Sequence, residues 1–406
     1  MGTYSSIKTA VLYAAYGSRA SYYDDWLDAF IEESAFDVAS FNIAQRHGRV
    51  SFEKDVKTFD LVVALHSVNA DNLIYALDIK SALQARKGLF LSFVGNELSL
   101  PGAPLKPKIN YLREVGVDLV ATQLILESGR YLYESTGAKV VAVTHALNPR
   151  SFHPTLANSE RPIDIGVRTF RYPSTFLGDE DRNNLISLFS DNKFMPELHN
   201  DIATNRRLKR SDWASFLNNC KGTIANEAGG YWLERDDATM LQIKKWLISK
   251  NSRRITVKSN PLFRRIIHKL PWSVRQALIK FFTVGPMQHE GLIGEEEDFR
   301  EVYELFFAEK PWPPEFSGKC VSSRHFDAAG TKTCQIMMEG RFNDIFKAHE
   351  HFIPLKRDLS NADEAVRMFQ DNAFREEMIE RTYSFVMDAH TYSHRLKDIQ
   401  KIIFNA

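Results

Sequence analysis

Short apolar runs and amphipathic stretches alternate along the first part of the chain. Apolar residues recur with helical spacing over 24–33, 70–85 and 127–135. Apolar runs too short for helices predict strands at 8–15, 36–42, 61–65, 88–94, 118–122 and 139–144. Strands that are apolar throughout and separated by helices are typical of a parallel sheet covered on both faces. The pattern therefore predicts a doubly wound α/β domain.

A second unit of the same kind follows a break in this pattern. Residues 148–162 are rich in proline and polar residues and have no periodicity, which is typical of an interdomain linker. A new strand is expected at 163–167, and a helix at 211–217 leads to a further strand at 222–225. At 406 residues the chain is also long for a single core. We therefore expect two domains.

Polar residues follow several predicted strands of the first domain. In doubly wound sheets, ligands bind outside the carboxyl ends of the strands. The residues at these positions are 17–19, His66 and Ser67, Asn96 and Glu97, Thr122 and Gln123, and His145. A lone histidine after a strand is more often a structural residue than a catalyst. Three polar groups on one rim nevertheless favour a functional cleft.

The net charge of +1 hides an uneven distribution. Residues 244–280 contain eleven lysines and arginines, no acidic residue, and many apolar and aromatic side chains. This composition predicts an interfacial segment, 244–283, that lies on an anionic membrane surface. A pair of ordinary helices with a solvated basic face is the simpler alternative. Nucleic-acid binding is a weaker one, since no known nucleic-acid motif is present, and we expect no nucleic-acid partner.

Composition otherwise indicates a cytoplasmic globular protein. Three scattered cysteines, Cys220, Cys320 and Cys334, are too few for a disulfide framework or a zinc site. No apolar run reaches the roughly 20 residues that span a bilayer, and we expect no signal peptide. The start MGTYSS formally fits a myristoylation pattern, which is short enough to arise by chance. No Walker loop, nucleophile elbow or Asp-x-Asp metal motif is evident, so we expect neither a metal nor another cofactor.

The most informative stretch is 322–340, SSRHFDAAGTKTCQIMMEG. It predicts a helix start at 324–326, a tight turn at Gly330 and a buried strand at 333–338. A carboxylate at Asp327 is favoured near a helix N-terminus, and such an end also suits an anionic ligand. A sugar nucleotide would use Asp327 for its ribose hydroxyls and the small residues for close backbone approach. The alternative is an ordinary helix–turn–strand unit whose acid is only a cap.

This stretch, with HFIPLKRDLSNADEAV and FREEMIERTYSFVMDAHTYSHR after it, resembles the carboxy-terminal half of CgeB-like and related GT-B glycosyltransferases. In that group an arginine, an aromatic residue, an acid, small residues and Gly-Thr precede a strand. The chain departs from the group at two positions. Asp327 stands where glutamate is usual, and Lys319 stands where many retaining members have a further glutamate.

The resemblance implies a GT-B fold, in which two facing Rossmann-like domains enclose a cleft. Residues 1–155 would bind the acceptor, 156–390 the nucleotide sugar, and 391–406 would form a helix that crosses back to the first domain. Two arginines directly after the strand at 163–167 can clamp a diphosphate, although a surface pair is equally compatible with the sequence. The donor-binding residues implied in this way are Arg168, Arg171, Arg324, Asp327, Gly330, Thr331 and Lys332.

The expected reaction is metal-independent transfer of a sugar to a glycan or lipid-linked glycan in cell-surface polysaccharide synthesis, at the inner face of the plasma membrane. An inverting enzyme needs a base for the acceptor hydroxyl, for which Glu97 and His66 are the candidates. A retaining enzyme needs no strong base. The loop at 226–230 is either a sugar or base contact or a plain turn. A sugar-nucleotide epimerase and a non-catalytic sugar- or lipid-binding module are the alternatives.

Overall fold

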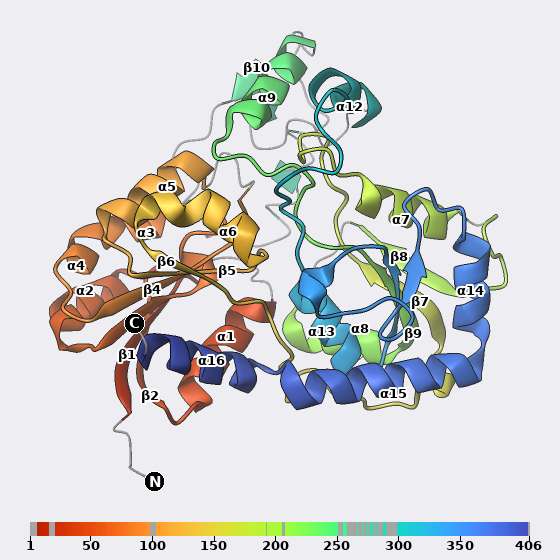
Figure 1. The fold of residues 1–406 in the computed structure, drawn as a ribbon, viewed down its shortest axis with the longest axis horizontal. Helices are drawn as coiled ribbons and strands as arrows, with labels where there is room; N and C mark the ends of the chain where they lie inside the picture. Colours follow the sequence, from red (N-terminus) through yellow and green to blue (C-terminus); the bar gives the residue numbers. More distant parts are fainter. Residues whose placement is uncertain are drawn as a thin grey trace.

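The computed structural model describes residues 6–15, 21–97, 103–191, 193–204, 208–250, 255–257, 287–289 and 299–404, together with 266, 270, 274, 277, 278 and 282. Two parallel sheets lie side by side, one built from the first part of the chain and one from the second (Figure 1). The predicted α/β architecture with two Rossmann-like halves is confirmed. The expected ligand loop at 17–19 lies outside the described residues.

The first sheet has the strand order β2-β1-β3-β4-β5-β6, and all its neighbouring strands are parallel. The strands are β1 (Ile7–Tyr13), β2 (Phe36–Asn42), β3 (Leu61–Ala64), β4 (Leu89–Val94), β5 (Leu119–Thr122) and β6 (Lys139–Ala142). The helices between them are α1 (Ser21–Glu32), α2 (Arg46–Asp55), α3 (Ile74–Asp78), α4 (Lys80–Gln84), α5 (Leu105–Glu114) and α6 (Leu126–Tyr133). The single helix expected at 70–85 is therefore two short ones.

Both faces of this sheet are buried. Val62 and Ala64 of β3 pack into one hydrophobic cluster, and Leu61 and Val63 pack into another on the opposite face. Successive side chains of a strand point to opposite faces, so a strand covered on both sides must be apolar throughout. This explains why the strands appear in the sequence as continuous apolar runs.

The second sheet has the order β13-β12-β9-β7-β8 and is also parallel. Its strands are β7 (Ile163–Arg168), β8 (Asn200–Ala203), β9 (Cys220–Ala225), β12 (Cys334–Met338) and β13 (Ile353–Leu355). Its helices are α7 (Asp181–Ser190), α8 (Arg210–Asn218), α13 (Ser323–Gly330), α14 (Ala362–Gln370) and α15 (Asn372–Ala389). Helix α13 runs through Gly330, where the sequence predicted a turn.

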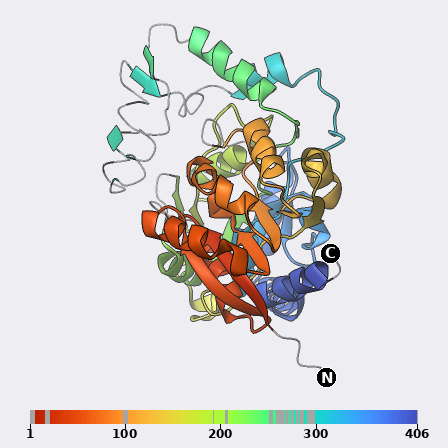
Figure 2. The same ribbon diagram turned by 90° about the vertical axis from the view of Figure 1, so that its left-hand side faces the viewer.

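An insertion between β9 and α13 stands above both sheets, as Figures 1 and 2 show. It contains α9 (Ala238–Lys250), α12 (Phe299–Phe306) and the parallel pair β10 (Ile255–Val257) and β11 (Met287–His289). A small hydrophobic cluster that includes Ile243 and Val302 joins the two helices. Most of the basic segment 244–283, including Pro261 and Pro271, lies outside the described residues.

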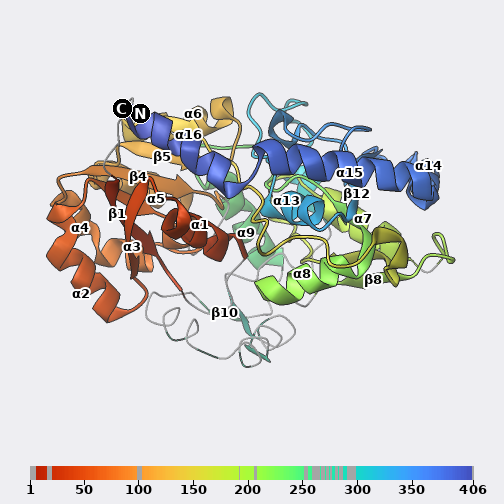
Figure 3. The same cartoon turned by 90° about the horizontal axis from the view of Figure 1, so that it is seen from below.

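The chain crosses between the halves twice, and the two crossings lie side by side. The Leu147 N–H donates to the His390 carbonyl at 2.9 Å, and the Tyr392 N–H donates to the Leu147 carbonyl at 3.1 Å. After the second crossing, α16 (Tyr392–Phe404) packs against α1, sharing a cluster with Trp26. Figure 3 shows α16 on the first half and α15 along the second. The last helix therefore completes the core of the first half.

Residues 148–162 are packed rather than free. The Phe152 side chain is buried in the second half, and the Arg161 guanidinium is buried among backbone carbonyls, including that of Thr331 at 2.7 Å. A buried cation needs such acceptors because its desolvation is costly. The segment was predicted to be a linker, but some of its residues attach it to the second half of the protein.

Side chains also join the two halves. The Arg210 guanidinium of α8 contacts Asp25 and Asp28 of α1 at 2.9 and 2.6 Å. On the other side, the Tyr131 ring of α6 stacks on Phe316, with ring centroids 4.2 Å apart. These contacts link helices of the first half to later parts of the chain.

Candidate functional site

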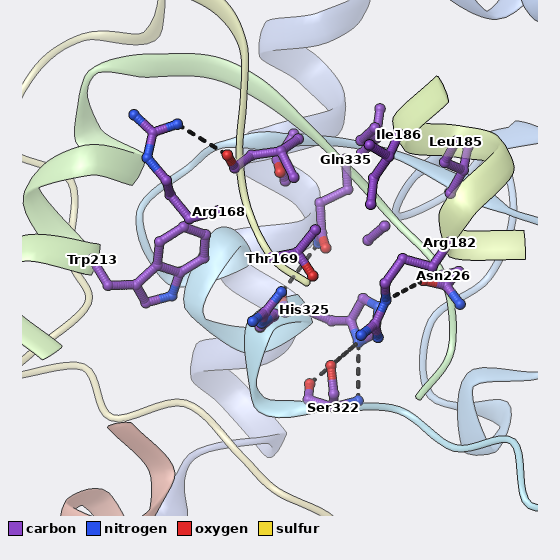
Figure 4. Close-up of a pocket in the computed structure, with 15 residues that line it drawn as sticks. Arg168, Thr169, Arg182, Leu185, Ile186, Trp213, Asn226, Ser322, His325 and Gln335 are labelled. Atoms are coloured by element: carbon purple, nitrogen blue, oxygen red, sulfur yellow. Dashed lines mark hydrogen bonds between the residues drawn. The ribbon is translucent and has the colours of Figure 1, made fainter. Parts of the chain in front are cut away.

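A pocket opens at the carboxyl ends of β7 and β9, beside the N-terminus of α13 (Figure 4). The space in and around it amounts to about 550 Å³, part of which is open solvent. Its lining residues are Val167, Arg168, Thr169, Arg182, Leu185, Ile186, Trp213, Thr223, Ile224, Ala225, Asn226, Ser322, Arg324, His325 and Gln335. This is the position at which parallel sheets of this kind bind ligands.

Three buried polar atoms of this lining have no hydrogen-bond partner among the residues that the structure describes. They are Thr169 Oγ1, His325 Nε2 and Gln335 Oε1. The Gln335 amide nitrogen donates to the His325 carbonyl at 3.1 Å, which leaves the amide oxygen as an acceptor. Leaving such a group unsatisfied costs about 1–3 kcal/mol. The pocket is therefore built for a polar occupant or for ordered water.

His325 is fixed as a neutral hydrogen-bond donor. Its Nδ1 accepts the Ser322 N–H at 3.0 Å, so the proton of the neutral ring is on Nε2. Burial lowers the pKa of His325 to about 4, with a smaller opposing effect from the Ser322 backbone. The same contact is half of a capping box that begins α13. One residue thus starts the helix and supplies a donor to the pocket.

Arg182 and Arg324 are two of the three arginines that line the pocket. Arg182 is in the first turn of α7, where its guanidinium lies 3.8 Å above the Tyr172 ring and its Nε lies 3.4 Å from Asn226 Oδ1. Arg324 is exposed in the first turn of α13. Together with the N-terminus of α13, they make the mouth of the pocket suitable for an anion such as a diphosphate. The sequence analysis did not predict Arg182. A basic residue in the first turn of α7, the helix that follows β7, is a signal that could have identified it.

The two arginines expected at the diphosphate have other partners in this structure. The Arg168 guanidinium pairs with Asp201 at 2.7 Å and lies 3.9 Å above the Phe216 ring. Figure 4 shows it turned away from Thr169, His325 and Gln335. Arg171 is outside the lining and donates to Ser187 Oγ at 3.0 Å. A phosphate contact by either residue would need its side chain to rotate.

Asp327 lies beneath the pocket. Only 1% of it is exposed, and it accepts a hydrogen bond from the Trp213 indole N–H at 3.0 Å. Burial raises the pKa of Asp327 well above its ordinary value, and nearby Asp25 raises it further. Trp213 is part of the pocket lining, and Asp327 is not. The ribose contact stays a prediction, which requires Trp213 to give way to the ligand.

Three of the expected ligand residues lie at the far end of α13: Gly330, Thr331 and Lys332. Because a helix of 8 residues is about 12 Å long, this end is about 12 Å from the start of the helix. A Cβ on Gly330 would lie 2.3 Å from Leu147 Cδ1, so the glycine allows the crossing chain to pack closely. Thr331 is fully buried, and its hydroxyl donates to the Asp327 carbonyl at 3.0 Å. Lys332 pairs with Glu380. These three residues pack the helix and do not reach the pocket.

The two candidate bases have different surroundings. His66 is buried, and burial lowers its pKa to about 3, so its ring is a poor proton acceptor at neutral pH. Glu97 follows β4, is half-buried, and accepts a hydrogen bond from the Tyr133 hydroxyl at 3.0 Å. It also lies close enough to Cys320 of the second half to raise the pKa of that thiol, after the larger effect of burial. Glu97 is therefore partly open to solvent, whereas His66 is buried.

The loop at 226–230 is more than a plain turn. The Glu227 carboxylate is buried and accepts the Phe342 N–H at 2.7 Å, which ties the loop to the end of β12. Burial raises the pKa of Glu227. The Ala228 N–H donates to the Cys320 carbonyl at 2.8 Å. The loop thus anchors the segment that leads into α13.

The described residues hold no group of three His, Cys, Asp or Glu side chains placed to bind a metal ion. Among the helices in that same part of the chain, none combines the length and the apolar character needed to cross a membrane.

Comparison with solved structures defines the fold. An alpha-glucosyltransferase solved with UDP and a 13-mer DNA containing a HMU base is 13% identical, with 98% of this chain and 100% of that chain covered and a TM-score of 0.52. At this identity the likeness concerns the fold alone. HepE of Anabaena, solved with UDP and glucose, is 8% identical, with 98% of this chain and 100% of that chain covered. The sucrose-phosphate synthase of Thermosynechococcus elongatus is 12% identical, with 98% of this chain and 99% of that chain covered. Each has a TM-score of 0.47, which is too low to support a conclusion. The fold is GT-B, as predicted.

Sequence comparison adds a partial match. Residues 309–401 match the family model described as "Glycosyl transferase-like", which covers less than a quarter of the chain. The matched segment contains α13, β12 and, with them, Arg324, His325 and Gln335 of the pocket. No curated protein matches the chain significantly. The expected likeness to glycosyltransferases is confirmed at this level, and the CgeB-like subtype stays a prediction.

Proposed function

We propose that the chain is a glycosyltransferase that transfers a sugar from a nucleotide-sugar donor. One observation carries the proposal: Arg182, Arg324 and three buried polar atoms that have no hydrogen-bond partner among the described residues line a pocket at the N-terminus of α13. That helix is inside the segment matched by the glycosyl transferase-like family model. Polar atoms inside and positive charge at the mouth suit a nucleoside diphosphate, whose phosphates would lie at Arg182 and Arg324.

In the proposed reaction, the acceptor oxygen forms a bond to the anomeric carbon and the bond from that carbon to the diphosphate breaks. Negative charge then develops on the diphosphate, where Arg182, Arg324 and the α13 N-terminus stabilise it. We propose that these groups replace a metal ion. If the reaction inverts configuration, Glu97 takes the proton of the acceptor hydroxyl.

The proposed acceptor is a glycan or lipid-linked glycan of cell-surface polysaccharide. Support comes from the eleven basic residues of 244–280, which suit docking of the enzyme to the anionic inner face of the plasma membrane. The same charge would suit DNA, which is present in the structure of the alpha-glucosyltransferase with the same fold. Co-sedimentation with vesicles containing one-third phosphatidylglycerol, in competition with a DNA duplex, decides between them. Binding to DNA alone would refute the membrane proposal.

Thermal unfolding with a panel of nucleoside diphosphates and nucleotide sugars tests the donor site. A ligand at 100 times its dissociation constant adds about 2.7 kcal/mol of stability. We expect one nucleotide to stabilise the native chain, and Arg182→Gln and Arg324→Gln each to weaken its binding. Arg300→Gln is the control, because Arg300 is exposed on α12, away from the pocket. If no nucleotide stabilises the native chain, the donor site is wrong.

Product analysis then separates the alternatives. A glycosyltransferase releases nucleoside diphosphate in proportion to glycosylated acceptor. An epimerase converts the nucleotide sugar without any acceptor, and a binding module leaves it unchanged.

A further inference from the structure

Trp312 is a partly exposed aromatic residue that its neighbours hold in place. Half of it is exposed (50%), yet it contacts three other groups. Its ring meets Tyr231 and Trp232 edge-on, at centroid distances of 5.0 and 5.7 Å. The Arg357 guanidinium lies 4.4 Å from the ring centroid. A single exposed apolar side chain is ordinary, but one fixed on three sides by aromatic and cationic neighbours is not.

Buried charges hold these neighbours in place. Asp181 is buried, accepts the Tyr231 hydroxyl and lies 3.5 Å from the Arg357 Nε. Lys319 lies 4.1 Å from the Tyr231 ring and pairs with the fully buried Asp179 at 2.7 Å. Ion pairs away from water repay their desolvation poorly, so they are weak evidence for stability alone. Here they fix the orientation of the surface formed by Trp312, Tyr231 and Arg357, which we call the aromatic platform.

The platform is next to the donor pocket. Asp181 faces the platform and Arg182, the next residue, lines the pocket, so the two sites are joined by neighbouring residues of α7 about 3.8 Å apart along the chain. Tyr231 follows the loop after β9, another element of the pocket lining. A group bound on the platform would therefore lie beside a donor in the pocket.

The platform matches the chemistry of a sugar ring. The C–H face of a pyranose packs on an indole ring, and its hydroxyls can accept hydrogen bonds from guanidinium N–H groups. Trp312 and Arg357 supply these two groups. We propose that the aromatic platform is a subsite for a pyranose ring of the acceptor glycan. The role of the platform as an acceptor subsite rests on the proposed function, whereas its binding of a sugar does not.

Saturation-transfer NMR with the methyl glycosides of glucose, galactose and mannose tests the platform on the full chain. We expect a signal for at least one sugar with the native protein and with Trp312→Phe, which keeps a flat ring. Trp312→Ala and Trp312→Leu should lower it at least five-fold, although leucine keeps apolar bulk. Leu305→Ala is the matched control, because Leu305 is a similarly exposed apolar residue on α12. Its signal should equal that of the native protein.

Nucleotide-induced thermal shifts measured on the same variants keep the two claims separate. We expect these shifts to be unchanged by every Trp312 variant. No sugar signal in the native protein, or an equal signal in Trp312→Ala and Trp312→Leu, would overturn the platform. Loss of the nucleotide shift in Trp312→Ala would also overturn it, by assigning the ring to the donor. A signal that depends on Trp312 in a protein that binds no nucleotide would support the platform and refute the proposed function.

Discussion

Replacing Asp25 with asparagine should remove a pH-dependent part of the stability of this protein. Asp25 is only 1% exposed, and its Oδ2 makes no hydrogen bond with any residue that the structure describes. Burial raises the pKa of Asp25 to about 6, against the opposing effects of Asn148 and Arg210. The ordinary value is 3.8. A shift of about 2 units corresponds to about 3 kcal/mol, since each unit is 1.36 kcal/mol.

The sign follows from which form the folded protein prefers. Because the folded-state pKa is higher, the folded protein binds the Asp25 proton more tightly than the unfolded chain does. The stabilisation is complete below pH 3.8 and is lost as the pH rises through about 6. Between pH 4 and 7.5, the native protein should therefore lose up to about 3 kcal/mol that Asp25→Asn does not lose.

Urea unfolding of both proteins at intervals of half a pH unit measures this difference. Titrating groups that do not interact with Asp25 contribute equally to both proteins and cancel in the comparison. Asp327 does not cancel fully, because Asp25 raises its pKa. Asp28→Asn is the matched control, because Asp28 also pairs with Arg210 but is more exposed. Parallel free-energy curves for the native protein and Asp25→Asn would show that burial does not perturb Asp25, and the reasoning would be wrong.

Three further substitutions test other parts of the structure. Gly330→Ala should destabilise the protein by about 1–3 kcal/mol in urea unfolding, because its Cβ would lie 2.3 Å from Leu147 and 2.7 Å from the Phe152 carbonyl; unchanged stability would contradict that packing. Glu97→Gln should lower kcat by about 10²–10⁴ if Glu97 is the base, with unchanged donor affinity; an unchanged kcat would exclude that role. Arg324→Gln should weaken donor binding by about 1.5–3 kcal/mol in calorimetry, and equal affinity would remove Arg324 from the phosphate site.

The pocket at the N-terminus of α13 shows which positions local sequence patterns can predict. Arg324 was expected near the phosphates and does line the pocket, because its place in the first turn of α13 follows from local signals. Arg168 was expected there for the same kind of reason and also lines the pocket, but its guanidinium pairs with Asp201 on the neighbouring strand β8. Which way a long side chain turns depends on partners that are distant in sequence. Local spacing does not contain that information.

The sequence by itself determined the two parallel sheets and the importance of 322–340. Strands such as β3 are recognisable because burial on both faces requires every residue to be apolar, and this requirement is written in consecutive positions. Only the tertiary structure decided which polar groups meet. Asp327 bonds to Trp213 of α8, and Lys319 pairs with Asp179 across 140 positions of the chain. Contacts of this kind follow from the packing of distant elements, so neither periodicity nor a local motif predicts them.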